Sequence, residues 1–289
     1  MRLSTSTNIM DRVNKVSVIP MEDCIERCYN AGYRVLDMNF CDMSTPGMPM
    51  ALDNWQSWVD KIGNLAAKLG VEFTQSHSHF YNVAKADVED REWREELVRR
   101  AIIGSGMLGT KWMVLHSGTV REEGYSMKES KRKNIEYLNK HLELSRKHNV
   151  GICVENLFDN TPNFRKYTAT AEELIDLVDT VNDPYLGICW DFGHGNLMGV
   201  SQALNLRKVG KRLKAIHAAD NNGIKDEHLL PLYGNIDWNE MMHVLKEIGY
   251  ENDFAFEITP FVDKIPAHIR DTFLRHTVEV GEYLLSLAI

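Results

Sequence analysis

The sequence predicts one α/β domain over residues 1–289, a single (β/α)₈ TIM barrel, and two observations carry that prediction. Eight short strand-like runs alternate along the chain with longer segments of helical periodicity. Ionisable residues stand at or near the C-terminal end of several of these runs, and in a parallel barrel those ends meet on the face that carries active sites. No linker, low-complexity tract or charge block divides the chain, which favours one domain over two.

The strand-like and helical segments follow one another in the order that a barrel requires. The expected strands are 3–9, 33–39, 71–77, 112–117, 151–156, 185–191, 213–219 and 254–258. The expected helices are 21–31, 52–69, 92–108, 127–148, 171–181, 237–248 and 266–287, with a less regular one at 201–210. Eight strands are the number that closes such a barrel.

Residues with special backbone preferences mark the ends of these helices. Gly32, Gly70 and Gly249 each follow a helical run and precede a strand, as a C-cap does. Asn149 is expected to end its helix in the same way. Thr170 followed by Glu173 has the spacing of a capping box at a helix N-terminus.

Composition narrows the classes of partner. The chain has 33 Lys and Arg against 41 Asp and Glu, a net charge of −8, and no evident basic groove, so we do not expect it to bind nucleic acid. Its five cysteines form no C-x-x-C pair. The N-terminal residues lack the apolar core of a signal peptide and no run is long enough to span a membrane, so a cytoplasmic location is expected.

Four ionisable residues interrupt the apolar runs at the ends of the last four expected strands, namely Glu155, Asp191, His217 and Glu257. An unpaired carboxylate buried in such a run costs several kcal/mol, roughly, or is neutralised. A divalent cation removes that cost, and a mixed oxygen and nitrogen ligand set suits Mn²⁺, Co²⁺, Mg²⁺ or Zn²⁺. The four residues are therefore predicted to bind one divalent metal ion.

Several strings of the sequence resemble the xylose-isomerase-like barrel superfamily in order along the chain. These are Ile152-Cys-Val-Glu-Asn156, Gly187-Ile-Cys-Trp-Asp-Phe-Gly-His194, Ile216-His-Ala-Ala-Asp-Asn-Asn-Gly223 and Phe256-Glu-Ile258. The most specific is Asp226-Glu-His-Leu-Leu-Pro-Leu-Tyr-Gly-Asn-Ile-Asp-Trp238, which looks like a segment of the sugar isomerases and epimerases. Leu232 and Tyr233 depart from that pattern, because relatives often have Gly with a small or acidic residue there.

The resemblance implies a metal-dependent sugar or sugar-phosphate isomerase or epimerase. In those members the positions of Glu155, Asp191, His217 and Glu257 bind the metal, and the two glutamates exchange a proton with substrate carbon. A carboxylate on each side of the sugar can remove and return that proton. His194 is expected to contact a substrate oxygen. Other reactions of the group, such as an inosose-type dehydration, remain open, as does a sugar-binding relative without catalysis.

The endonuclease IV class of the same superfamily gives the competing prediction, a multi-zinc AP endonuclease. Its members bind three zinc ions, and the further ligands match His77, His116, His194, Asp226 and His228. These five are therefore expected either to contact substrate or to bind additional zinc. The acidic net charge and the sugar-enzyme appearance of residues 229–238 favour the carbohydrate function.

The loops after the strands hold the determinants of substrate choice, and they are 40–51, 78–91, 118–127 and 157–169. Their candidate contacts are Asp42, Tyr81, Arg121, Asn160 and Arg165. None selects a phosphorylated over a free sugar, so the expected partner is a small-molecule sugar or sugar phosphate. A homo-oligomer is left open.

Overall fold

A parallel eight-stranded barrel forms the centre of the protein. In the computed structural model, which describes residues 1–10, 12–13, 17–121, 126–158, 165–262 and 265–288, the strands pair in the order β10-β1-β4-β5-β6-β7-β8-β9. Their bounds are Leu3–Ser6 (β1), Val35–Asn39 (β4), Glu72–His77 (β5), Trp112–Leu115 (β6), Gly151–Glu155 (β7), Leu186–Asp191 (β8), Leu213–His217 (β9) and Phe254–Phe256 (β10). The predicted (β/α)₈ barrel is therefore confirmed.

The barrel closes between its last two strands through a short parallel contact. Ala218 pairs with Phe256 just beyond β9, and the Ala218 amide donates a hydrogen bond of 2.7 Å to the carbonyl of Ala255. A separate antiparallel pair, β2 (Arg12–Val13) and β3 (Ser17–Val18), was not predicted. Its strands are two residues long and give no period that a sequence pattern could register.

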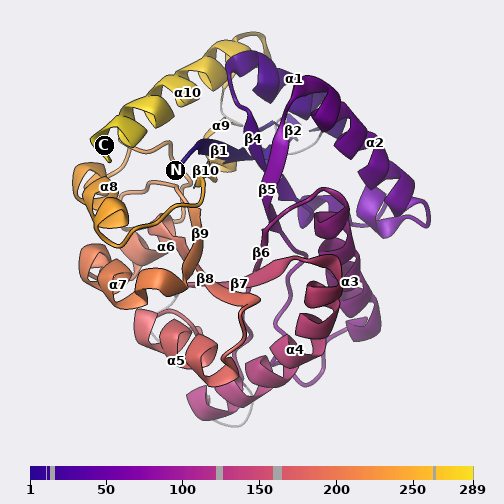
Figure 1. Cartoon of the computed structure of the whole chain (residues 1–289), viewed down its shortest axis with the longest axis vertical. Helices are drawn as coiled ribbons and strands as arrows, with labels where there is room; N and C mark the ends of the chain where they lie inside the picture. The colour runs from indigo at the N-terminus through magenta and orange to yellow at the C-terminus, as the bar shows by residue number, and fades with distance from the viewer. Residues whose placement is uncertain (11, 14–16, 122–125, 159–164, 263–264, 289) are drawn as a thin grey trace.

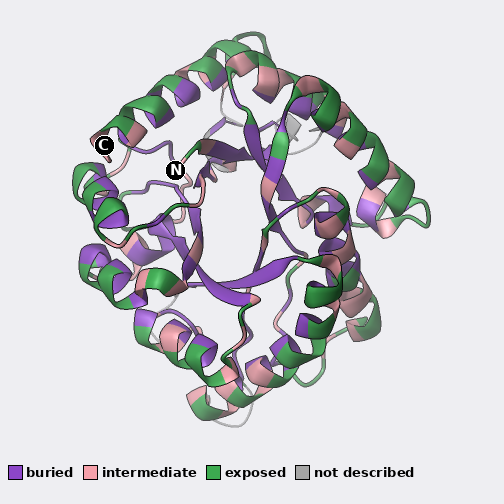
Figure 2. Cartoon of the chain, in the orientation of Figure 1, coloured by how far each residue is buried: buried purple, intermediate pink, exposed green. Residues whose placement is uncertain are grey.

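Helices surround the barrel as an outer ring (Figure 1). They are α1 (Met21–Ala31), α2 (Trp55–Leu69), α3 (Arg91–Met107), α4 (Met127–His148), α5 (Ala171–Val181), α6 (Phe192–Leu197), α7 (Gln202–Val209), α8 (Trp238–Glu247), α9 (Thr259–Val262) and α10 (Arg270–Leu287). Figure 2 shows the strands almost wholly buried and the outer faces of the helices exposed. None of the helices within the described ranges is long and apolar enough to cross a membrane.

Four of the five predicted caps, Gly32, Gly70, Asn149 and Thr170, stand at helix ends, whereas α8 has Ile248 as its C-cap, one residue before Gly249. Asn149 and Gly70 end α4 and α2 in the left-handed conformation, with φ of 57° and 70°, which asparagine and glycine tolerate best. The Thr170 hydroxyl accepts a hydrogen bond from the amide of Glu173 at 3.3 Å and caps α5. Some bounds differ: α2 begins at Trp55 rather than at residue 52, and α10 at Arg270 rather than at 266.

Two elements at the site were not expected. The first expected strand ends at Ser6, and a 3-10 turn over Thr7–Ile9 replaces its second half. Helix α6 follows β8 without a loop. The Asp191 carboxylate caps this helix, because its Oδ1 atom accepts a hydrogen bond of 2.6 Å from the amide of His194. A carboxylate at this position satisfies an otherwise free helix N–H. The same capping residue thus ends the strand and begins the helix.

Small apolar residues fill the inside of the barrel directly beneath the polar strand ends. Val114, Cys153, Cys189 and Ala215 form one buried cluster. Each stands two positions before an ionisable residue, and because side chains of a strand alternate between its faces, both point into the barrel. The pairs are Val114 with His116, Cys153 with Glu155, Cys189 with Asp191 and Ala215 with His217. The polar residues therefore form the top layer of a packed interior.

Candidate metal centre

Four side chains converge at the C-terminal ends of the last barrel strands. Glu155 ends β7, Asp191 ends β8, His217 ends β9, and Glu257 is the first residue after β10. Each offers one ligand atom, and these atoms all lie within 4.8 Å of one another. The structure therefore brings together the four residues that were predicted to share one metal ion.

The imidazole of His217 faces all three carboxylates with one nitrogen. Its Nδ1 atom lies 3.0 Å from Glu155 Oε1, 3.5 Å from Glu257 Oε2 and 3.9 Å from Asp191 Oδ2. The opposite nitrogen, Nε2, lies 3.5 Å from Oδ2 of Asp37 on β4. His217 is fully buried, so both ring nitrogens see only protein groups.

Burial and neighbouring groups shift the pKa values of the three carboxylates and of His217. Burial alone would raise the pKa of Glu155, but His217 and His116 hold it well below the ordinary value. Burial raises the pKa of Asp191 to about 6. For Glu257 burial again acts upward, yet His217 and His228 lower its pKa overall. For His217, burial acts downward, but the nearby Glu257 and Glu155 help to raise its pKa well above the ordinary value.

Buried oxygens without hydrogen bonds indicate what the cluster is built to hold. Glu155 Oε2 and Asp191 Oδ2 are buried and accept no hydrogen bond, although His116 Nε2 lies 2.8 Å from the first of them. Buried polar atoms without a partner are rare and costly in proteins. Three carboxylates and one imidazole are ligands that Mn²⁺, Zn²⁺, Co²⁺ or Mg²⁺ accept. The donor set therefore fits a divalent cation.

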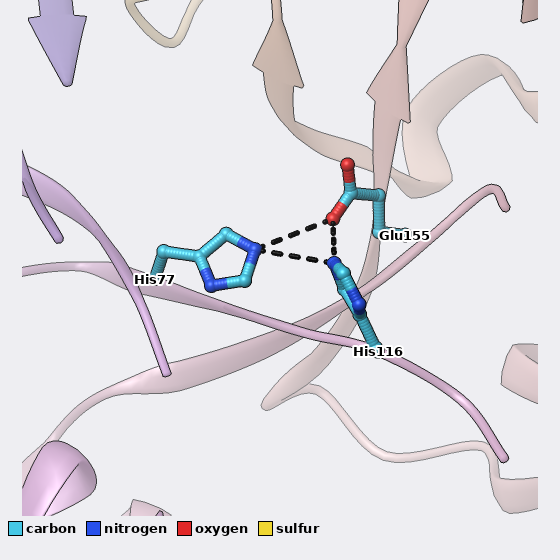
Figure 3. Close-up of side chains that lie close together, drawn as sticks. All are labelled: His77, His116 and Glu155. Carbon is cyan, nitrogen blue, oxygen red and sulfur yellow. Dashed lines mark hydrogen bonds and ion pairs between the residues drawn. The ribbon is translucent and has the colours of Figure 1, made fainter. Parts of the chain in front are cut away.

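A second group shares Glu155 with the first, and Figure 3 shows its three side chains pointing at one another. Glu155 Oε2 lies 3.5 Å from Nε2 of His77, and the two histidine Nε2 atoms are 3.3 Å apart. His77 Nδ1 donates to the carbonyl of Ser78 at 2.9 Å, which leaves the Nε2 lone pair directed at the group. His77, His116 and Glu155 thus form another candidate cation site.

A third group lies on the other side of the four residues. His228 Nε2 is 3.1 Å from Oδ2 of Asp226, and His194 Nε2 is 3.8 Å from the same oxygen. Both histidines donate Nδ1–H to backbone carbonyls, His194 to Asn156 at 2.8 Å and His228 to Glu257 at 2.7 Å. This arrangement fixes the rings with Nε2 toward Asp226, as it does in metal-binding histidines.

The loop that carries Asp226 and His228 is anchored by a buried carboxylate, Asp220. It accepts hydrogen bonds from the amides of Asn221, Leu232 and Ile236 and from the indole of Trp238, at 2.8–3.2 Å. His228 and Leu232 have positive φ, 45° and 78°, an uncommon conformation that surrounding contacts must maintain. Asp220 supplies these contacts for Leu232.

The three groups open into one cavity of about 340 Å³, here called the strand-end cavity. Seven of the nine predicted site residues line it, while Asp191 and His217 lie beneath it. Its other lining residues are Asn8, Asn39, Cys41, Asp42, Phe80, Leu157, Phe158 and Lys166. Among these described residues, Lys166 is the one lysine or arginine, and its ammonium stands 4.8 Å from the Phe158 ring centroid.

Of the predicted loop contacts that the structure describes, only Asp42 lines the cavity. Tyr81 is buried beside Tyr137, and Arg165 pairs with Glu173 at 2.6 Å. Arg121 is exposed and is not among the residues that line the cavity, and Asn160 lies outside the described residues. Asp37 was not predicted as a site residue, although it is an acidic residue inside the apolar run 35–38. Nor were the amides Asn8 and Asn39 predicted, which no spacing rule marks.

Comparison with known proteins places this arrangement in a family. Residues 25–275 match the xylose isomerase-like TIM barrels. The chain belongs to this family. The predicted resemblance is thereby confirmed.

Three relatives illustrate the range of the family. An uncharacterised protein of Methanocaldococcus jannaschii is 32% identical over 188 residues, 63% of this chain and 62% of that relative. A D-psicose 3-epimerase of Enterocloster bolteae is 33% identical over 93 residues, 32% of this chain and 29% of that enzyme. The crystal structure of a D-tagatose 3-epimerase-like protein has a TM-score of 0.75 at 25% identity, covering 98% of this chain and 99% of that one. The chain thus spans less than two thirds of the two curated relatives.

Two further similarities are at lower identity. A probable endonuclease 4 of Acholeplasma laidlawii is 24% identical over 227 residues, 73% of this chain and 76% of that protein. The crystal structure of an IolI protein with a bound zinc atom has a TM-score of 0.75 at 19% identity, over 100% of this chain and 99% of that one. The latter likeness concerns the fold alone.

Proposed function

We propose that this protein is a divalent-metal-dependent isomerase or epimerase that acts on a sugar or sugar phosphate by carboxylate-mediated proton transfer. One observation carries the proposal. Glu155 and Glu257 approach the same nitrogen of His217, at 3.0 and 3.5 Å, from strands on either side of Asp191 and His217. Two carboxylates beside one cation, both lining the strand-end cavity, are what a reversible proton transfer at carbon requires.

Glu155, Asp191, His217 and Glu257 would hold the metal ion, which when bound polarises a substrate carbonyl and neighbouring hydroxyl and so acidifies the adjacent C–H bond. One glutamate then accepts the proton from carbon and the other returns one to the opposite face. His194 lines the cavity beside Asp226 and would orient a substrate oxygen. The buried apolar layer of Val114, Cys153, Cys189 and Ala215 closes the site from below.

The surroundings of the two glutamates leave their side chains different freedom to move. Glu155 is contacted by His116 at 2.8 Å and by His77 and His194 at 3.5 Å. Glu257 is more open, with 13% of its side chain exposed against 1% for Glu155. A base that must move against substrate carbon needs that freedom, so we assign the first proton transfer to Glu257.

The comparisons support the reaction class. The D-psicose 3-epimerase segment and the D-tagatose 3-epimerase-like structure both come from proteins named for epimerisation of ketoses. The zinc of the IolI structure supports a metal-binding barrel of this type.

Exchange of substrate protons with solvent tests the proposal directly. Metal-loaded protein is incubated with free and phosphorylated ketoses in D₂O, and NMR follows the loss of the proton next to the carbonyl. Glu257→Gln should keep partial metal binding, because three ligands remain, yet lose exchange by a factor of at least about 10² when loaded with metal. Glu143→Gln, on the exposed face of α4, is the matched control and should exchange as the wild type does.

Retained exchange in Glu257→Gln would contradict its role as a base. Absence of exchange with every ketose in the wild type, with metal bound, would contradict the carbohydrate function itself. Release of water with formation of a double bond would point instead to a dehydratase of the inosose type.

A second candidate is hydrolysis of a phosphodiester by several metal ions, as in an AP endonuclease. The observation that favours it is the convergence of His77, His116 and Glu155, with a further group at His194, Asp226 and His228. Several cations together can generate a hydroxide and stabilise a transferred phosphoryl group. The acidic charge of −8 and the single lysine among the described cavity residues weigh against a DNA substrate.

Metal counting and one assay separate these two functions. Elemental analysis of protein purified without chelator should give about one metal ion per chain for the isomerase and about three for the nuclease. Incision of an oligonucleotide with one abasic site should be absent. Incision that is lost in both His77→Ala and His228→Ala would replace the first proposal with the second.

A further inference from the structure

We infer that Asp37 is a positioning residue for the metal ligand His217, and that Gln75 holds Asp37 in place. Asp37 lies on β4 and Gln75 on β5, far from the four residues in sequence. The Asp37 side chain is 1% exposed, and its Oδ2 atom lies 3.5 Å from Nε2 of His217. The inference rests on the metal site of the proposed function and is independent of the carbohydrate substrate.

A register shift between β4 and β5 sets the positions of Asp37 and Gln75. Strands β4 and β5 match Leu36 with Phe73 and then Asp37 with Gln75, so that Thr74 has no partner on β4. A bulge of this kind re-aims the side chains that follow it. Gln75 thereby shares the face of His77, two residues on, and Asp37 shares that of Asn39. Both His77 and Asn39 line the strand-end cavity, so Asp37 and Gln75 lie one layer below it.

Hydrogen bonds fix the Asp37 carboxylate against the ring. Gln75 Nε2 donates to Asp37 Oδ2 at 2.8 Å and also contacts the carbonyl of Ile216 at 3.3 Å, next to His217 in sequence. Gln75 thus connects the carboxylate with the backbone of β9. Two buried atoms of these side chains, Asp37 Oδ1 and His217 Nε2, have no hydrogen-bond partner. The carboxylate of Asp37 is an acceptor beside Nε2, a nitrogen that can donate, with Oδ2 at 3.5 Å.

The chemistry of the imidazole explains why His217 needs a hydrogen-bond acceptor beside Nε2. Nδ1 of His217 faces Glu155, Asp191 and Glu257, so Nδ1 is the atom that would bind a cation through its lone pair. In a neutral ring the proton must then reside on Nε2, where the nearest carboxylate is that of Asp37. A carboxylate that accepts this N–H selects the correct tautomer, holds the ring plane and increases the basicity of Nδ1.

Stability alone gives no reason for these residues. The interior positions Val114, Cys153, Cys189 and Ala215 on β6 to β9 are apolar, whereas Asp37 stands between Ser6 of β1 and Gln75 of β5. A buried carboxylate with one hydrogen-bonded oxygen costs free energy in the metal-free protein. A residue kept at such a cost is explained by the ligand that it orients.

The test compares metal affinity with stability in Asp37→Asn and Asp37→Leu. Asparagine leaves a weaker acceptor, and leucine of similar size leaves none. We expect the dissociation constant for Zn²⁺ or Mn²⁺, measured by calorimetry with a competing chelator, to rise about tenfold in Asp37→Asn and up to about a hundredfold in Asp37→Leu. The urea midpoint of the metal-free protein should stay the same or rise, because a buried charge has been removed.

Two further measurements keep the test independent of folding defects. Gln75→Leu removes the donor that holds Asp37 and should weaken metal binding by a smaller factor than Asp37→Leu. The ¹⁵N shifts of His217 in the metal-loaded wild type should report a protonated Nε2, and Asp37→Asn should change them. Asp183→Asn, which removes the carboxylate that pairs with Arg146 on the outside of the barrel, is the matched control with unchanged affinity.

The outcomes are distinguishable. Wild-type affinity in both Asp37 variants would overturn the positioning role and leave the metal site standing. A fall of affinity and metal-free stability together, in proportion, would assign Asp37 a structural role instead. A wild-type protein that binds no divalent cation would contradict the metal site of the proposed function and this inference with it.

Discussion

Glu155 and His217 meet at 3.0 Å, Oε1 to Nδ1, while the other oxygen of Glu155 faces His116 at 2.8 Å. The glutamate therefore turns one oxygen to each of two candidate cation groups. Its carboxylate is 1% exposed, and Oε2 also lies 3.5 Å from Nε2 of His77. This shared position makes Glu155 the residue on which the whole site depends.

Glu155→Gln should therefore weaken metal binding at both groups. The amide removes the negative charge that His217 and His116 share, and its NH₂ repels a cation. We expect the metal content after dialysis to fall to below about a tenth of the wild-type value. Mass spectrometry of the metal content measures it.

Glu143→Gln is the control for that measurement, since Glu143 is exposed on α4. Full metal content in Glu155→Gln would show that the cation binds without this ligand and would contradict the shared role.

The stabilisation by added metal should depend on pH through Asp191. Burial raises its pKa to about 6 from 3.8, so its ionised form destabilises the metal-free fold above that pH and its proton competes with the metal below it. The metal-induced increase in melting temperature should be small at pH 5 and should grow as pH rises through about 6. Calorimetric scans with and without metal across pH 5–8 measure it, and a constant increment would contradict the assignment.

Asp226 and His228 should stabilise the metal-free protein together. Burial alone would lower the pKa of His228, but Asp226 raises it to about 10. The folded pKa is above the unfolded one, so this stabilisation is fully present below about pH 6.5 and is lost as pH rises through about 10. Asp226→Asn should lower the urea midpoint at pH 6 and have little effect at pH 11. An equal effect at both values would contradict the charged pair.

Removing the Asp220 carboxylate should disorder the loop at 221–238. Asp220→Ala leaves three amides and the Trp238 indole without their acceptor, which should cost about 3 kcal/mol or more of unfolding free energy. Asp237→Ala removes only the N-cap of α8, where the carboxylate accepts the amide of Glu240 at 3.0 Å, and should cost about 1 kcal/mol. Denaturant unfolding compares them, and equal losses would contradict the anchoring role of Asp220.

The barrel could be predicted because its signals are local. The run Ile152-Cys-Val ending in Glu155 shows an apolar strand and its polar end within four residues, and Asn149 marks the helix end before it. Short features escaped prediction, such as the two-residue strands β2 and β3 and the helix α6 that begins on Asp191. Their boundaries depend on single hydrogen bonds that leave no periodicity.

The sequence by itself determined the fold and the predicted metal ligands Glu155, Asp191, His217 and Glu257. The reason is that the C-terminal ends of all strands meet on one face of a parallel barrel. Only the tertiary structure decided which nitrogen of His217 faces Glu155, that Glu155 is shared with His77 and His116, and that Asp37 lies behind the ring. These relations depend on side-chain direction and on a register shift at Thr74, neither of which is encoded in the spacing of residues along one strand.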